Sequence, residues 1–95
     1  MPYRTTPRAD EDYYAIYRYG IEHFGRVRAE AYADRLDETF EFLAAHPAAA
    51  RMRYELDPPV RALPVGVHLV VYDVDADGVV RILRIPHARS DWAND

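Results

Sequence analysis

The residues of this chain that could carry out chemistry are arginines and a histidine in its second half. Arginine side chains can hold a phosphate group and stabilise its transition-state charge, while a histidine of near-neutral pKa moves the proton. This is the set of groups that a ribonuclease would need. The same arginines could instead pair with carboxylates such as Asp73 and Asp91. The candidate cluster consists of Arg61, Arg81, Arg84, His87 and Arg89.

Other patterns that could indicate a site lack an essential member. The segment 73–78 matches the start of a calcium loop, D-x-D-x-D-G, but Arg84 occupies the twelfth position, where calcium needs a bidentate glutamate. The histidines show no metal-ligand spacing, and Ser90 lacks the flanking glycines of a nucleophile elbow. We therefore expect no metal and no cofactor.

The composition places the candidate residues in one small domain. The chain has 95 residues, 49% of them hydrophobic, which fits a single domain over residues 1–95. Twelve basic residues, all of them arginine, stand against 16 acidic ones, and the net charge of -4 argues against a protein that mainly binds nucleic acid. With no cysteine, signal peptide or long apolar run, the sequence predicts a cytoplasmic protein that does not enter the membrane.

A short strand and two helices are predicted ahead of the arginine-rich region. Residues 3–6 form a short polar and apolar stretch that could be a strand. Thr6 is a suitable N-cap and Pro7 suits the first helical position, so a helix should begin there and end at Gly25. A second helix is expected at about residues 26–45. Apolar stripes with a 3.6-residue period indicate that the two form a hairpin.

After a proline-rich connection the apolar period changes to two, which predicts strands at residues 60–64, 67–74 and 79–85. The last two are joined by a tight turn over residues 75–78. The predicted fold class is therefore α+β: an N-terminal strand, a helical hairpin and a three-stranded antiparallel meander, with the helices on one face of the sheet. Because both faces are apolar, the uncovered face should bind another chain. Its predicted residues are Val70, Tyr72, Val80 and Ile82.

Four stretches of the sequence form an ordered pattern. They are the helix start Thr6-Pro7-Arg8-Ala9, the helix end His23-Phe24-Gly25, the strand pattern R-x-L-P-x-x-x-H-x-x-x-Y over residues 61–72 and the closing pattern R-I-L-R-x-x-H-x-x-x-D-W over residues 81–92. This ordered set resembles the ParE toxins of the RelE/ParE superfamily over nearly the whole chain. Two positions depart from the family pattern: Ala50 replaces a common glycine and Pro86 replaces an aliphatic residue.

The resemblance implies a toxin of a type II toxin–antitoxin module, held inactive by a ParD-like antitoxin whose disordered C-terminal region folds onto it. It further implies inhibition of DNA gyrase without catalytic turnover and no sequence-specific contact with nucleic acid. We expect the antitoxin on the open sheet face and in the groove beside the helical hairpin. Gyrase should meet the C-terminal segment, with Trp92 as aromatic anchor. Trp92 could instead pack the end of the sheet against the first helix. The predicted gyrase-binding residues are Arg84, His87, Arg89, Asp91 and Trp92.

Two alternatives remain open. The sister branch of RelE-like toxins cleaves mRNA on the ribosome with the same fold, and here its catalytic residues would be Arg61, Arg81 and His87. The acidic net charge and the absence of lysine argue against this nuclease. The chain could also be a degenerate toxin that acts only as a co-repressor with its antitoxin, an alternative that Ala50 and Pro86 leave open.

Overall fold

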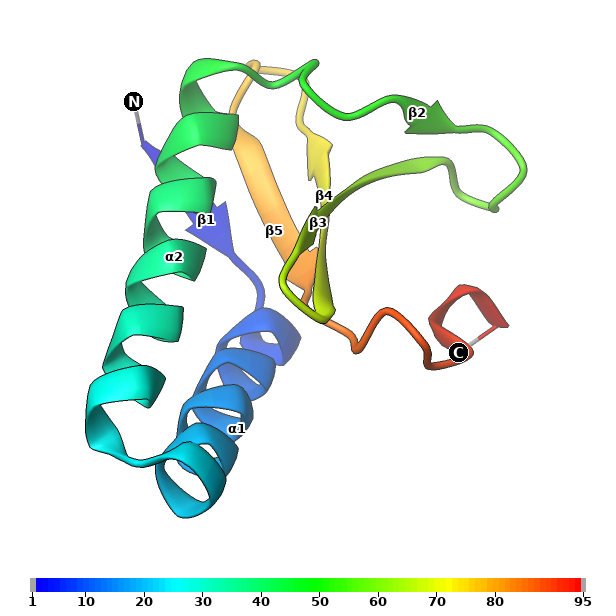
Figure 1. Ribbon diagram of the computed structural model, residues 1–95. Coiled ribbons are helices and arrows are strands. Elements are labelled where there is room, and N and C mark those ends of the chain that lie inside the picture. The colour runs from blue at the N-terminus through cyan, green and yellow to red at the C-terminus, as the bar shows by residue number, and fades with distance from the viewer. Residues whose placement is uncertain (1, 95) are drawn as a thin grey trace.

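Two helices and a five-stranded sheet make up the fold of this protein. The structure is a computed structural model, and it describes residues 2–94. The α1–α2 hairpin lies on one side of the sheet and the C-terminal segment on the other (Figure 1). Along the chain, the elements are β1 (Tyr3–Thr5), α1 (Pro7–Phe24), α2 (Arg26–Ala45), β2 (Met52–Arg53), β3 (Val60–Val65), β4 (His68–Val74), β5 (Val80–Arg84) and the 3-10 helix η1 (Trp92–Asn94).

Local signals place both helices where the sequence predicts them. The Thr6 hydroxyl accepts a hydrogen bond from the Ala9 backbone N–H at 3.1 Å, which caps α1. Gly25, at φ 85°, ends α1 and directly precedes α2. The two helices lie close together at Gly20 and Ala29. A Cβ added at Gly20 would lie only 3.1 Å from the Cβ of Ala29. The predicted hairpin is confirmed.

The sheet is mixed, and its strand order is β1-β5-β4-β3-β2. β1 pairs with β5 in parallel, and the other pairs are antiparallel. The predicted meander is therefore the centre of a larger sheet. β2 lies in the segment that the sequence indicates as a connection. Its two residues pair with Arg61 and Val60 of β3, and so short a strand gives no period-two signal.

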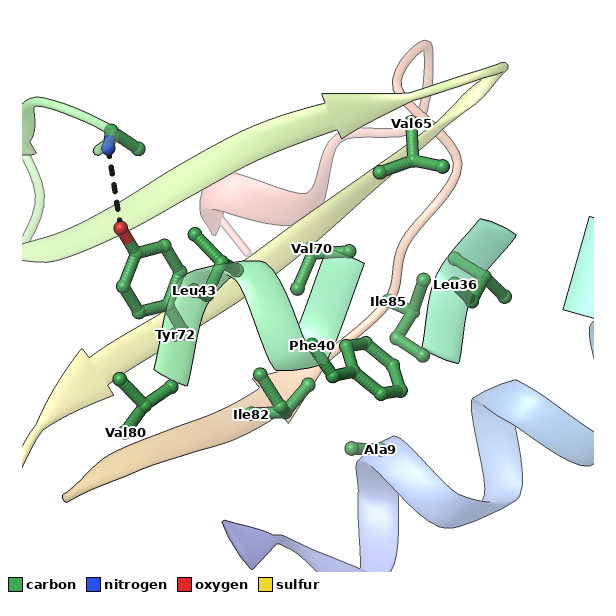
Figure 2. Close-up of a cluster of buried hydrophobic side chains, with 11 residues drawn as sticks. Ala9, Leu36, Phe40, Leu43, Val65, Val70, Tyr72, Val80, Ile82 and Ile85 are labelled. Carbon is green, nitrogen blue, oxygen red and sulfur yellow. Dashed lines mark hydrogen bonds between the residues drawn. The ribbon is translucent and has the colours of Figure 1, made fainter. Parts of the chain in front are cut away.

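The face of the sheet under the helices holds the main core, and the prediction of an open face is wrong for the four residues assigned to it. Each of these side chains is at most 1% exposed, and all four belong to one buried cluster with Leu36, Phe40 and Leu43 of α2 (Figure 2). In this fold they lie where no antitoxin can reach them. The four residues are Val70, Tyr72, Val80 and Ile82.

The opposite face of the sheet is covered by the chain's own C-terminal segment. Trp92 is 8% exposed and packs there with Val71 and other residues of β3 and β4. Backbone hydrogen bonds from Leu69 N–H to the Pro86 carbonyl (2.9 Å) and from Ala88 N–H to the Val67 carbonyl (2.8 Å) hold the segment beside β4. Both apolar faces are therefore covered within residues 2–94. In that same range, no helix has the length and apolar character needed to cross a membrane.

Candidate functional site

The three residues of the nuclease alternative lie far apart. Arg61 points to the helix side of the sheet, where its guanidinium donates to the Ala50 carbonyl. Arg81 points to the opposite face, because Val80 and Ile82 on either side of it in β5 face the core under the helices. Its guanidinium donates two hydrogen bonds to the Asp73 carboxylate, at 2.8 and 2.6 Å. His87 bridges to the first residue of β4, five residues or roughly 17 Å from Asp73. No phosphate could contact all three side chains.

Trp92 holds the C-terminal segment on the sheet, as in the packing alternative, although it packs on β3 and β4 rather than against the first helix. Two guanidinium groups lie over its indole ring, with the Arg84 Cζ at 5.4 Å and the Arg53 Cζ at 5.9 Å from the ring centroid. Arg84 also donates a hydrogen bond to the Trp92 carbonyl. Arg84 and Trp92, two members of the predicted gyrase-binding set, therefore have structural partners in this fold.

The other three predicted gyrase-binding residues are exposed on the same segment. The Arg89 backbone N–H donates to Nδ1 of His87 at 3.1 Å, and the Asp91 carboxylate accepts from the Asn94 side chain at 2.8 Å. These local bonds order the backbone while the Arg89 guanidinium extends into solvent. The segment thus presents an imidazole, a guanidinium and a carboxylate on a fixed backbone.

An apolar groove of about 730 Å³ opens between the helical hairpin, the β3–β4 turn and the start of the C-terminal segment. Three side chains of its wall, Tyr19, Phe24 and Val67, are each more than half exposed, and exposed apolar side chains gathered in one groove are typical of a surface that binds a partner. The sequence predicts a groove beside the hairpin but not its lining, because these residues meet only after folding. The lining includes Ile16, Tyr19, Phe24, Arg28, Tyr32 and Val67.

The end of the groove is formed by Tyr32 and two histidines. The Tyr32 hydroxyl donates to the Val65 carbonyl at 2.9 Å and lies 2.7 Å from Nδ1 of His68. The ring of His87 meets that of His68 edge-on, with centroids 5.7 Å apart. At Gly66, which has φ 56°, an added Cβ would lie 2.7 Å from the Tyr32 ring. Glycine is therefore needed for the turn to close over Tyr32.

The pKa of His68 is lowered from its usual value. Burial disfavours the charged imidazole, and the neighbouring His87 acts in the same direction, while the carboxylate of Asp12 opposes them. The Tyr32 hydroxyl contacts the same ring. Since Tyr32 donates its proton to Val65, the neutral His68 donates from Nδ1 to the tyrosine oxygen and leaves Nε2 as an acceptor.

We expect acidification from pH 7 to pH 5 to destabilise the protein in part through His68. With its folded-state pKa below the unfolded value of about 6.5, His68 is neutral in both states at higher pH. As the pH falls below the unfolded-state pKa, His68 of the unfolded chain binds a proton while His68 of the folded protein stays neutral. This proton uptake favours unfolding, and the loss of stability ends once the pH is below the folded-state pKa. Urea denaturation at both pH values should therefore show a smaller loss of stability for His68→Asn than for the wild type. Equal losses would contradict this assignment.

The amino-acid sequence is similar to toxins of one family over nearly the whole chain. A family model described as the ParE toxin of type II toxin–antitoxin system, parDE, matches residues 3–92. Toxin ParE1 of Caulobacter vibrioides is 34% identical over 86 residues, which span 90% of this chain and 88% of that protein. Toxin ParE1 of Mycobacterium tuberculosis is 29% identical over 89 residues, which span 94% and 91%.

A solved structure shares the fold. It is described as the chromosomal ParDE TA system from P. aeruginosa and matches with a TM-score of 0.77 and 25% sequence identity. The match covers 94% of this chain and 97% of the other.

Proposed function

Because the chain belongs to the ParE toxin family of type II toxin–antitoxin systems, we propose that it inhibits DNA gyrase in the cytoplasm and is neutralised by a ParD-like antitoxin. The observation that carries this proposal is the family match over residues 3–92, which includes every element of the sheet and both helices. The separation of Arg61, Arg81 and His87 favours gyrase inhibition over mRNA cleavage.

The apolar groove is the proposed antitoxin site. It exposes Tyr19 and Phe24 to solvent, whereas the two sheet faces are already covered within the chain. A disordered antitoxin segment that folds on binding gains most from a preformed apolar surface, because burial there offsets its ordering entropy. The groove meets this requirement, and the four core residues that the sequence assigned to the antitoxin do not.

The exposed part of the C-terminal segment is the proposed gyrase contact. His87, Arg89 and Asp91 remain available to a target. Arg84 and Trp92 act as positioning residues, because the half-buried Arg84 and the buried Trp92 fix the segment on the sheet. A segment ordered before binding loses less entropy on association.

The two departures from the family pattern fit the fold, which argues against a degenerate toxin. Ala50 is buried, and its backbone N–H donates to the Tyr72 hydroxyl at 3.3 Å (Figure 2). Pro86 follows the end of β5, and its carbonyl accepts from Leu69. Because proline lacks only the N–H donor, its position after the last strand keeps the sheet intact.

A gyrase supercoiling assay that also scores cleaved DNA tests the proposal. We expect the purified protein to inhibit supercoiling and accumulate cleaved DNA, and the antitoxin encoded beside its gene to relieve both effects. Arg89→Glu should weaken inhibition about tenfold, because it reverses a charge on the proposed contact. Arg18→Glu, on the exposed side of α1, is the matched control and should leave inhibition unchanged. Folded protein without effect on gyrase would refute the proposal and lead to a ribosome-programmed mRNA cleavage assay.

A further inference from the structure

The charge of the groove is opposite to that of the chain as a whole. The protein carries a net charge of -4, yet among the described residues no aspartate or glutamate lines the groove. The lining residues with polar side chains are Tyr19, Tyr32, His68, His87 and Arg28, of which Arg28 alone carries a full charge at neutral pH. The groove therefore combines an apolar wall with a locally positive edge.

Arg28 has no partner within residues 2–94. It makes neither a hydrogen bond nor an ion pair there, whereas Arg26 in the same helical turn bonds to Glu30 at 2.9 Å. Successive helical residues are rotated by about 100°, so Arg26 and Arg28 point to nearly opposite sides of α2. Only Arg28 lines the groove. Its guanidinium is thus available to an acceptor from outside the chain.

The position of Arg28 in α2 makes a role in helix stability a poor explanation. It lies in the first turn, where the positive end of the helix dipole favours acidic residues, and that turn contains none. The N-cap, Gly25, offers no side chain to the first backbone N–H groups. The N-terminal end of α2 and Arg28 therefore add to the same positive potential beside the groove.

We propose that the groove binds an amphipathic helix of the antitoxin whose apolar residues cover Tyr19 and Phe24 and whose aspartate or glutamate pairs with Arg28. This inference rests on the proposed function. Residues three and four apart share one helix face, so the partner's carboxylate would stand one turn from an apolar anchor. An antitoxin with lysine at that position would face a like charge. Arg28 thereby selects the cognate antitoxin.

The test compares two charge reversals in the full-length toxin. The antitoxin encoded beside the toxin gene is titrated against wild type, Arg28→Glu and the matched control Arg26→Glu by isothermal calorimetry. We expect Arg28→Glu to raise the dissociation constant by at least about 30-fold and Arg26→Glu by less than about threefold. The difference should shrink in high salt, because mobile ions screen the pair. Thermal unfolding should change little, since a glutamate suits the first turn of α2.

A charge swap completes the test. Each acidic residue in the antitoxin's toxin-binding region is changed to arginine in turn, and one of these variants should restore binding to Arg28→Glu by at least about tenfold. If the wild-type toxin binds the antitoxin but Arg28→Glu binds as tightly, or no swap restores binding, this inference is wrong and the proposed function stands. If the wild-type toxin does not bind the antitoxin, both are wrong.

Discussion

Replacing Trp92 with alanine is expected to lower the free energy of unfolding by about 3–5 kcal/mol, the usual cost of removing a buried tryptophan. The side chain is 8% exposed and fills the apolar cluster on the sheet face opposite the helices. Its loss would also leave Arg53 and Arg84 without the ring that both guanidinium groups contact. Small domains have only about 5–15 kcal/mol in total, so the effect is large. Urea denaturation followed by circular dichroism measures it.

Two further variants separate packing from target contact. Trp92→Phe keeps most of the apolar surface and should lose only about 1–2 kcal/mol. Asp91→Ala changes the exposed neighbour and should alter stability by about 0.5 kcal/mol or less. A Trp92→Ala protein that is as stable as wild type but no longer inhibits gyrase would contradict the structural role. It would restore Trp92 as the anchor of a target contact.

Elements with local signals could be predicted from the sequence. Thr6, Pro7 and Gly25 act within one helical turn of the positions they define, and the observed α1 begins and α2 ends where expected. The turn over residues 75–78 is likewise fixed locally, since the Asp75 carboxylate accepts from the backbone N–H groups of Asp77 and Val79. These interactions span few residues and leave a pattern that can be recognised.

The choice of sheet face could not be predicted, because both faces of β4 are apolar. Val70 and Tyr72 face the helices, while Leu69 and Val71 face the C-terminal segment. The alternation of side chains separates the two sets but does not say which set the helices cover. The second face is covered by Trp92, which lies 18 residues beyond the end of β4 in the sequence. No local pattern reveals such a contact.

The candidate site shows the same limit. The sequence predicts His87 in the C-terminal segment, but not that His87 also lines the groove, because that position depends on its bridge to His68. Arg61 and Arg81 look alike in sequence, but their strands direct them to opposite faces. Arg28 carries no motif at all. Its proposed role follows from the absence of a partner among residues 2–94, which only the structure reveals.

Phe24→Ala is expected to weaken antitoxin binding by at least about 30-fold, the effect of removing an aromatic hot spot of about 2 kcal/mol or more. Phe24 is the last residue of α1, is 57% exposed and lines the groove beside Tyr19, with ring centroids 6.2 Å apart. Because the ring is mostly in solvent, its loss should cost under about 1 kcal/mol of folding stability. Calorimetry with the antitoxin measures the affinity, and growth of cells that express both proteins reports neutralisation.

Phe42→Ala provides a matched control, because Phe42 is an aromatic residue of similar exposure, 48%, that lies near the far end of α2 and outside the groove. Its removal should change antitoxin affinity by less than about threefold. Both variants should still inhibit gyrase without antitoxin, since neither residue lies in the C-terminal segment. In cells, Phe24→Ala should then arrest growth even with antitoxin present, whereas Phe42→Ala should be neutralised. Equal affinities for the two variants would place the antitoxin elsewhere on the toxin, because the groove would contribute no more to binding than an unrelated apolar surface.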